Sequence, residues 1–253
     1  MSGSAPRELR GTGLVVRAGA ATHVGRVRDH NEDALLASGR VFAVCDGMGG
    51  HAAGEVASRL AVEALATLDE HPPAGADDVT RALGQANEHI LRSEAAHPEQ
   101  RGMGTTATGL VVVDAGDHEQ WVVLNVGDSR VYRLAEGGLG LVTRDHSEVR
   151  ELLEAGLIDA DEVPTHPLRN VITRALGSDP APEPDLWVLP PTAGERFVVC
   201  SDGLSNELAD DEIEHLLTAA PDPQAAADAL VAAAVRAGGR DNVSVVVVAV
   251  DPE

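Results

Sequence analysis

The feature that most constrains the fold is a series of short, almost continuously apolar runs that are rich in β-branched residues. The runs are four to eight residues long, which suits strands buried on both faces and is far below the ~18 residues of a membrane helix. Between residues 107 and 142 they are separated only by short polar or glycine-containing breaks, which leave no room for crossover helices and predict antiparallel hairpins. The five clearest runs are Val41–Cys45, Leu110–Val113, Trp121–Val126, Phe197–Cys200 and Val243–Val250.

Helical periodicity appears in the segments between these runs. Apolar residues recur at three-and-four spacing in four stretches, and Asp78 and Asp222 are placed to cap the second and the fourth. Gly238-Gly239 then ends the fourth stretch before the last strand. The expected helices cover residues 54–70, 79–90, 210–218 and 224–237.

The order of elements predicts the fold class. Strands, two helices, many strands, further helices and a last strand are typical of an α+β fold in which helices cover paired sheets. A chain of 253 residues allows one large domain, which we expect to span residues 14–251 after a flexible lead-in over residues 1–13. The stretch from about 144 to 174 is polar and contains one short helical piece.

The charge balance limits the partners. The chain has 19 Lys and Arg against 41 Asp and Glu, a formal net charge of −22, and every fixed cation is an arginine because the sequence contains no lysine. Neither nucleic acid nor a membrane is expected as a partner, because phosphate backbones and anionic lipids attract basic stripes. Two cysteines do not make a disulfide framework, and the first ten residues contain no apolar signal-peptide core. We therefore expect a cytoplasmic protein, and we expect it to be a monomer.

Acidic residues gather where the predicted strands begin or end. A single Asp at a strand end is common turn chemistry, whereas five strand ends with the same feature indicate one shared rim. Like charges ~4 Å apart repel by about 1 kcal/mol in water and by roughly four times as much at a protein-like dielectric, so such a rim needs a cation. With no lysine present, bound metal is the simplest source, and carboxylate and carbonyl oxygens favour Mg²⁺ or Mn²⁺ over zinc. The acids concerned are Glu32, Asp33, Asp46, Asp128, Asp202 and Asp241.

The glycines after Asp46 permit a second interpretation. Gly47-x-Gly49-x-x-Ala52 satisfies a loose dinucleotide fingerprint, follows a predicted strand and opens a predicted helix. Two features argue against a nicotinamide enzyme. Asp46 would place a carboxylate beside the pyrophosphate, and the first helix is followed by a second helix where a parallel strand is needed. The alternative role of these glycines is close backbone approach, which lets the Gly47 carbonyl and an anionic ligand reach the metals.

Seven short motifs lie in order along the chain. They are Arg28-Asp29-His30-Asn31-Glu32-Asp33, Val44-Cys45-Asp46-Gly47-Met48-Gly49-Gly50-His51, Met103-Gly104-Thr105-Thr106, Val126-Gly127-Asp128-Ser129-Arg130, Asp145-His146-Ser147, Cys200-Ser201-Asp202-Gly203-Leu204 and Gly239-Arg240-Asp241-Asn242-Val243. In this register, from about Val16 to Val250, the chain resembles the metal-dependent, type 2C protein Ser/Thr phosphatases in their compact bacterial form. The resemblance implies a four-layer α-β-β-α sandwich, with two antiparallel β-sheets packed face to face and flanked by helices.

The resemblance also implies a binuclear centre of Mn²⁺ or Mg²⁺ at one end of the sandwich. It implies two ions per subunit, with a third and weaker site beside them. In this arrangement Asp46 bridges the two ions, Asp202 and Asp241 complete one of them, and the Gly47 carbonyl binds the other.

Three further acids take outer roles in the same scheme. Glu32 is expected to act on the second ion through water, Asp33 to hold metal-bound water or orient a neighbour, and Asp128 to serve the third metal. The reaction that the resemblance implies is hydrolysis of phosphoserine and phosphothreonine by in-line attack of a metal-bridging water or hydroxide, with no protein nucleophile.

Arg28 is expected to bind the substrate phosphate bidentately, as a guanidinium fork does. The sequence leaves two candidates for the general acid that protonates the leaving oxygen. Some relatives carry a His directly after the Asp-Gly pair, whereas this chain has Met48 there. His51 lies three residues on and could substitute, or metal-bound water could protonate the leaving oxygen.

Residues 144–174 match the family's flap, a mobile segment beside the active site that influences substrate choice. Ser147 and the Thr165-His166-Pro167 turn are its candidate substrate contacts. The expected partners are phosphorylated Ser/Thr proteins, the targets of a Ser/Thr kinase. The alternative function is a catalytically inactive phosphatase fold that serves as a binding or signalling module. An inactive relative would normally lack a metal ligand, whereas every acidic ligand position is filled in this chain.

Overall fold

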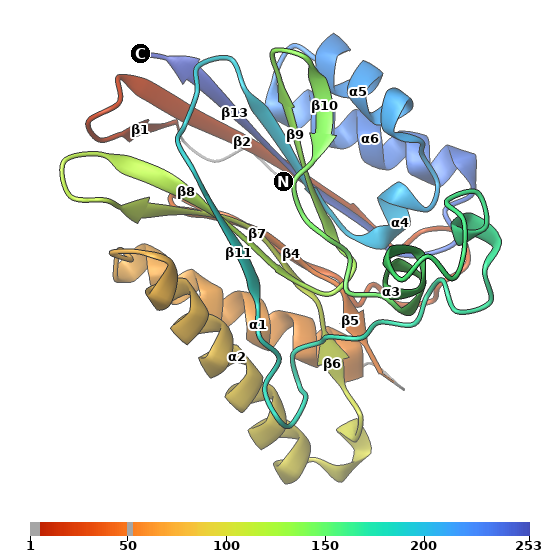
Figure 1. Ribbon diagram of the computed structural model, residues 1–253. Helices are drawn as coiled ribbons and strands as arrows, with labels where there is room; N and C mark the ends of the chain where they lie inside the picture. Colours follow the sequence, from red (N-terminus) through yellow and green to blue (C-terminus); the bar gives the residue numbers. More distant parts are fainter. Residues whose placement is uncertain (1–5, 50–52) are drawn as a thin grey trace.

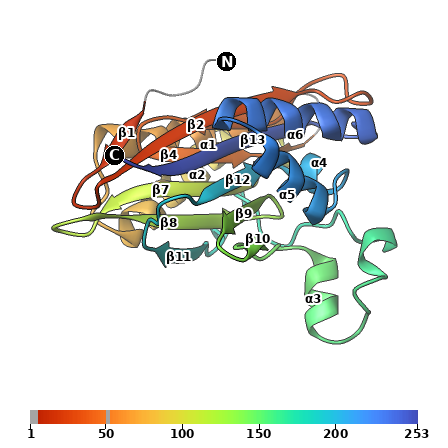
Figure 2. The ribbon, with the colours of Figure 1, turned by 90° about the horizontal axis from the view of Figure 1, so that it is seen from above.

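The computed structural model describes residues 6–49 and 53–253. Two antiparallel sheets pack face to face, and helices cover the outer face of each (Figures 1 and 2). The α+β class and the four α-β-β-α layers expected from the sequence are thereby confirmed.

The larger sheet has six strands, and all of its pairings are antiparallel. Its strands are β1 (Arg7–Leu9), β2 (Leu14–His23), β9 (Arg130–Ala135), β10 (Gly138–Leu141), β12 (Arg196–Cys200) and β13 (Val243–Pro252). Their order across the sheet is β1-β2-β13-β12-β9-β10. The last strand of the chain therefore lies in the middle of this sheet, paired along its whole length with β2.

The second sheet has five strands and is also antiparallel. Its strands are β3 (Ala34–Ala37), β4 (Val41–Cys45), β7 (Ala107–Asp114), β8 (Glu119–Val126) and β11 (Asp185–Leu189), in the order β11-β8-β7-β4-β3. Two short strands, β5 (Gly47–Met48) and β6 (Gly104–Thr105), pair separately beside it.

Not every short break in residues 107–142 is a hairpin. The predicted hairpins β7–β8 and β9–β10 are confirmed, but the break at Gly127-Asp128 carries the chain from one sheet to the other. Gly127 has φ 111°, and a Cβ there would lie 2.5 Å from the side chain of Thr106. Only glycine fits this crossing, which places Asp128 at the edge of both sheets.

Helices form the two outer layers. They are α1 (Ala53–Glu70) and α2 (Ala76–Ala96) against the five-stranded sheet, and α4 (Asp202–Ser205), α5 (Asp210–Ala219) and α6 (Pro223–Ala237) against the six-stranded sheet. The expected helical piece in the polar stretch is α3 (Glu148–Glu154), which stands away from the sandwich (Figure 2). Short 3₁₀ turns occur at Pro98–Gln100 and Val163–Thr165. Within residues 6–49 and 53–253, none of the helices is both long and apolar enough to cross a membrane.

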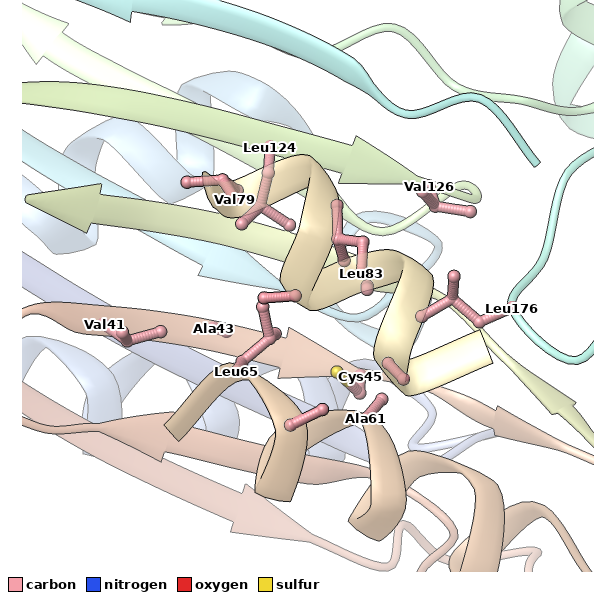
Figure 3. Close-up of a cluster of buried hydrophobic side chains, with 14 of the residues drawn as sticks. Val41, Ala43, Cys45, Ala61, Leu65, Val79, Leu83, Leu124, Val126 and Leu176 are labelled. Carbon is pink, nitrogen blue, oxygen red and sulfur yellow. The ribbon is translucent and has the colours of Figure 1, made fainter. Parts of the chain in front are cut away.

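Three apolar layers hold the sandwich together. Figure 3 shows the outer one, in which Leu65 of α1 and Leu83 of α2 lie over β4 and β8. Between the sheets, the Trp121 ring meets the edges of Phe42 and Phe197 with centroids 6.1 and 5.8 Å apart. The third layer packs α4, α5 and α6 on the six-stranded sheet. Because all three interiors are closely packed, the strand ends are held in fixed positions.

Two local expectations were wrong. The lead-in over residues 1–13 is not wholly loose, because Arg7–Leu9 pairs with β2, Leu9 is buried, and Arg7 forms an ion pair of 2.7 Å with Glu119. Asp78 does not cap α2 either. The helix begins two residues earlier, at Ala76, and the Asp78 carboxylate accepts a 2.7 Å hydrogen bond from the N–H of Ala74.

The cap predicted at Asp222 is confirmed and gives a first test. Its carboxylate accepts a 2.8 Å hydrogen bond from the N–H of Ala225 in the first turn of α6. Asp222→Ala leaves that N–H without a protein acceptor and is expected to lower the free energy of unfolding by about 1 kcal/mol. In a domain of this size the melting temperature should fall by about 2–4 °C. Thermal unfolding checks this, with Asp222→Ser as the capping control; an equal loss in both variants would contradict it.

Candidate metal centre

The acidic residues singled out in the sequence meet at one end of the sandwich. Asp33 lies directly before β3, and Asp46 directly after β4, whose ends are joined by the pairing of Ala34 with Cys45. Asp128 lies between β8 and β9, Asp202 opens α4 after β12, and Asp241 precedes β13. Burial raises the pKa of the Asp46 carboxyl, and the charges of the other four aspartates, which lie close to it, raise it further. The shared rim predicted from the strand ends is therefore present.

Asp46 is held through its backbone. Its N–H donates a 2.9 Å hydrogen bond to Oγ1 of Thr106, and its carbonyl accepts from the N–H of Thr106 and from Oγ1 of Thr105, each at 2.9 Å. The hydroxyl of Ser129 lies 2.9 Å from Oγ1 of Thr106 and extends this network toward the β8–β9 crossing. Thr105 and Thr106 appeared in the sequence only as part of a motif, with no role assigned.

Gly47 packs closely against the backbone of two neighbouring segments, and its predicted approach to the metals stays a prediction. A Cβ at this position would lie 2.2 Å from the carbonyl oxygen of Gly54 in α1 and 2.5 Å from that of Glu32. The Gly47 N–H donates to the Glu32 carbonyl at 3.2 Å. The Glu32 carboxylate accepts from the backbone of Gly54, at the start of α1. Any side chain at Gly47 would push Glu32 and α1 apart.

Burial and mutual repulsion shift the acids far from their ordinary behaviour. Burial raises the pKa of Asp202 to about 6, of Asp33 to about 7 and of Asp128 to about 8, and neighbouring carboxylates add to each shift. The pKa of Asp46 is raised well above its usual range by the same two causes. Clustered carboxylates with raised pKa values are stabilised by a bound cation.

Two buried oxygens point to the same conclusion. Among the residues that the structure describes, Oδ1 of Asp33 and Oδ1 of Asp128 are buried and have no hydrogen-bond partner. The other oxygen of Asp33 accepts a 2.9 Å hydrogen bond from Ser201, which leaves Oδ1 as a free acceptor. Buried acceptors without donors are costly unless a cation or water satisfies them. The donor set is all oxygen, so these residues fit Mg²⁺ or Mn²⁺ better than a softer metal.

The carboxylates alone do not complete a metal site. In residues 6–49 and 53–253, no three Asp, Glu, His or Cys side chains form a group that would hold an ion by themselves. Mg²⁺ and Mn²⁺ commonly take part of their ligands from water and backbone carbonyls. The carbonyl of Gly47, next to Asp46, stays the predicted backbone ligand.

Arg28 lies at the mouth of the site, in the loop between β2 and β3. Its Nη2 forms an ion pair of 2.8 Å with Oδ2 of Asp241, and about half of its side chain is exposed (53%). The hydrogen bond to Asp241 raises the pKa of the guanidinium, which stays charged. Arg240, the other arginine next to these acids in sequence, is turned to Glu207 at 2.9 Å. Arg28 thus lies beside the acidic rim and is open to solvent.

A cavity of ≈ 560 Å³ opens at this end of the molecule. Arg28, Asp128, Asp202 and Asp241 line one part of it, and the flap lines the other with residues that include Ser147, Val163, Arg169 and Asn170. Ser147 is the candidate substrate contact that the structure places there, although it is almost fully buried. In the part of the chain that the structure describes, the Thr165-His166-Pro167 turn does not line this cavity. The flap element α3 lies beside this end of the sandwich in Figure 1.

Three sequence expectations about nearby residues have different outcomes. Cys45 and Cys200 are buried and unpaired, as expected for small apolar groups. The dinucleotide interpretation is excluded, because α1 is followed by α2 and the sheets are antiparallel. His51 lies outside the described residues, so its role as an acid stays a prediction.

Comparison with known proteins agrees with this geometry. A sequence profile described as "Protein phosphatase 2C" matches residues 22–235. The serine/threonine protein phosphatase PstP of Mycobacterium tuberculosis is 41% identical over 236 residues, which cover 92% of this chain but only 45% of that protein. The serine/threonine phosphatase stp of Listeria monocytogenes is 35% identical over 242 residues, which cover 90% of this chain and 93% of the relative.

Solved structures of protein phosphatases are also similar to this chain. The crystal structure of the Mycobacterium tuberculosis phosphatase PstP/Ppp superposes with a TM-score of 0.87 at 39% identity, covering 93% of this chain and 99% of that one. The catalytic domain of PstP in complex with two manganese ions has a TM-score of 0.85 at 39% identity, covering 94% and 99%. The profile match spans most of the chain, and both relatives exceed 30% identity. The chain belongs to the protein phosphatase 2C family.

Proposed function

We propose that the protein is a metal-dependent protein serine/threonine phosphatase. The observation that carries this proposal is the cluster of buried, raised-pKa carboxylates, two of them with unpartnered oxygens, next to the solvent-exposed Arg28. Family membership and the manganese-bound relative support a centre of two Mn²⁺ or Mg²⁺ ions. A third, weaker site beside Asp128 stays part of the proposal.

The ligand assignment follows the position of each acid. Asp46 feels the charges of Asp33, Asp128, Asp202 and Asp241, and it would bridge the two ions. Asp202, whose pKa is raised by burial and by the nearby charge of Asp241, would complete one ion together with Asp241. The Gly47 carbonyl would bind the other ion. Glu32 would act on that second ion through water, and Asp33, fixed by Ser201, would orient metal-bound water.

When bound, the two ions supply Lewis-acid polarisation of the phosphoryl group and lower the pKa of water at the site. The chain itself binds and orients the substrate. Arg28 would place its guanidinium fork on two phosphoryl oxygens, and Asp241 holds the fork in position by the 2.8 Å contact. The flap residues that line the cavity would contact the polypeptide around the phosphorylated residue.

Phosphate release from p-nitrophenyl phosphate and from a phosphothreonine peptide tests the proposal. The metal-stripped protein should be inactive, and Mn²⁺ should restore turnover of both substrates. Absence of metal-dependent turnover would overturn it and would favour the inactive binding module. Calorimetric titration with Mn²⁺ separates the two further, because a binding module need not take up two ions per chain.

Loss of the Arg28 fork should weaken substrate binding more than turnover. A charge-assisted hydrogen bond contributes about 1.5–3 kcal/mol, so Arg28→Ala should raise KM about 10- to 100-fold. Arg28→Lys keeps the charge but not the fork and should recover only part of this loss. Steady-state kinetics with p-nitrophenyl phosphate measures both. Arg26→Ala, two residues away in the same exposed loop, is the matched control; an equal effect there would contradict the role of Arg28.

The remaining assignments are proposals of the same kind. Phosphorylated Ser/Thr proteins are the proposed substrates, supported by the similarity to serine/threonine phosphatases. We also propose that a Ser/Thr kinase phosphorylates them. A cytoplasmic location is supported by the two unpaired buried cysteines, since oxidising compartments favour disulfides. We also propose that the protein acts as a monomer.

A further inference from the structure

The loop between β2 and β3 carries three of the proposed site residues without any regular structure of its own. Residues 24–33 form neither helix nor strand, yet they include Arg28, Glu32 and Asp33. No backbone ladder fixes such a loop, so its position depends on hydrogen bonds from neighbouring segments. One backbone contact, from the N–H of Arg26 to the carbonyl of Gly239 at 2.7 Å, ties it to the segment before β13.

Asn242 supplies three further contacts to this loop. Its side chain is almost fully buried (6% exposed) and reaches three points of this loop. Its Oδ1 accepts a 2.8 Å hydrogen bond from the N–H of Glu32, and its Nδ2 donates to the carbonyls of Val24 and His30, each at 2.9 Å. Val24 and His30 lie on either side of Arg28 in the chain. One amide group therefore holds both flanks of Arg28 and the backbone of Glu32.

The same residue also orients the acid next to it. The backbone N–H of Asn242 donates to Oδ1 of Asp241 at 2.8 Å, while Oδ2 of Asp241 binds Arg28. Its carbonyl packs against Gly203, directly after Asp202, where a Cβ would lie 2.0 Å from the Asn242 oxygen. Asn242 thus lies where the Arg28 loop, Asp241 and the start of α4 meet.

We propose that Asn242 is the positioning residue that sets Arg28 and Glu32 in register with Asp241, so that phosphate and metal are bound at one defined separation. This inference rests on the proposed function, since it takes Arg28 as a phosphate ligand and the acids as metal ligands. Asn242 touches neither substrate nor metal. It acts through the loop, and its removal should alter phosphate and metal affinity together.

The chain offers a closely matched control in Asn87 of α2. Asn87 is also almost fully buried (2% exposed) and also makes three hydrogen bonds to one loop. Its Oδ1 accepts from the N–H groups of Gly177 and Ser178 at 2.7 and 3.2 Å, and its Nδ2 donates to the Ser178 carbonyl at 3.0 Å. Neither Asn87 nor Ser178 lines the cavity in the part of the chain that the structure describes. Asn87→Ala therefore removes the same chemistry at residues that do not line the cavity.

The experiment compares wild type, Asn242→Ala and Asn87→Ala. Calorimetry measures binding of Mn²⁺ and, with Mn²⁺ present, of inorganic phosphate; kinetics measures KM and kcat for p-nitrophenyl phosphate. Asn242→Ala should weaken Mn²⁺ and phosphate binding about tenfold each and raise KM by a similar factor, with a smaller fall in kcat. Asn87→Ala should lower the melting temperature similarly and leave all three constants within about twofold of wild type.

A double variant sharpens the test. Because Asn242 acts on phosphate through Arg28, adding Asn242→Ala to Arg28→Ala should change KM by less than about twofold. Effects that multiply in the double variant would overturn the proposal. It would also be overturned if Asn242→Ala and Asn87→Ala had the same binding constants. If Asn242→Ala does not fold, Asn242→Ser is judged by the same criteria. Should wild type show no hydrolysis, the calorimetric comparison still decides the role of Asn242 separately from the proposed function.

Discussion

Replacing Asp46 by asparagine is expected to lower metal-dependent turnover on the order of 1000-fold while the fold survives. The metals contribute several kcal/mol of transition-state stabilisation, and a neutral amide at the proposed bridging position would not hold both ions. Asp202→Asn should have a comparable effect. Initial rates with p-nitrophenyl phosphate at saturating Mn²⁺ measure the loss, and circular dichroism checks the fold.

The same substitution should make the metal-free protein more stable. Burial and four neighbouring carboxylates raise the pKa of Asp46, so in the metal-free protein at neutral pH this carboxyl must take up a proton on folding, a cost that Asn avoids. The melting temperature of the metal-stripped variant should therefore exceed that of wild type, while Mn²⁺ should raise it less. Asp77→Asn, an exposed acid in the first turn of α2, is the control for removing a charge elsewhere. Turnover near the wild-type rate in Asp46→Asn or Asp202→Asn would show that the ligand assignment is wrong.

Metal removal should make stability fall as the pH rises. In the folded, metal-free state the pKa values of Asp202, Asp33 and Asp128 are about 6, about 7 and about 8, against ~3.9 for an unfolded Asp. Between these limits the folded state binds more protons than the unfolded state, so the free energy of unfolding decreases with pH. The stability is fully present below about pH 4 and is lost as the pH rises through the folded pKa values.

Bound Mn²⁺ should reverse this trend, because it binds the deprotonated carboxylates of the folded state only. Melting temperatures of metal-stripped protein should fall by at least about 5 °C from pH 5 to pH 8, and the increase on adding Mn²⁺ should be largest at pH 8. Asp46→Asn should show a shallower fall. A melting temperature of the metal-stripped protein that rises or stays constant over this range would contradict the electrostatic account of the site.

The sequence predicted the location of the site because of a simple geometric rule. Apolar composition predicts strands such as β4, β12 and β13 directly. In an antiparallel sheet, the end of one strand lies beside the start of its neighbour. Asp46, Asp202 and Asp241 therefore met at one rim as predicted. The individual ligand roles came from the resemblance alone, and they stay predictions.

What the sequence did not predict depends on contacts between distant segments. The β8–β9 break looks like any short hairpin turn, and its passage between sheets depends on the packing of Gly127 against Thr106. Strand β1 is stabilised because Leu9 is buried and because Arg7 donates a hydrogen bond to Glu119, more than one hundred residues away in the chain. Asn242 was quoted only as part of a motif. Its three hydrogen bonds reach across more than two hundred residues, and no local pattern records them.

The most direct test of the central claim is phosphate release from a phosphothreonine peptide as metal-stripped protein is titrated with Mn²⁺, with ion binding followed by calorimetry on the same preparation. The account predicts no release without metal and full turnover when two ions are bound per chain. Phosphate release that persists in the presence of a chelator would contradict it, as would an inactive protein at saturating Mn²⁺.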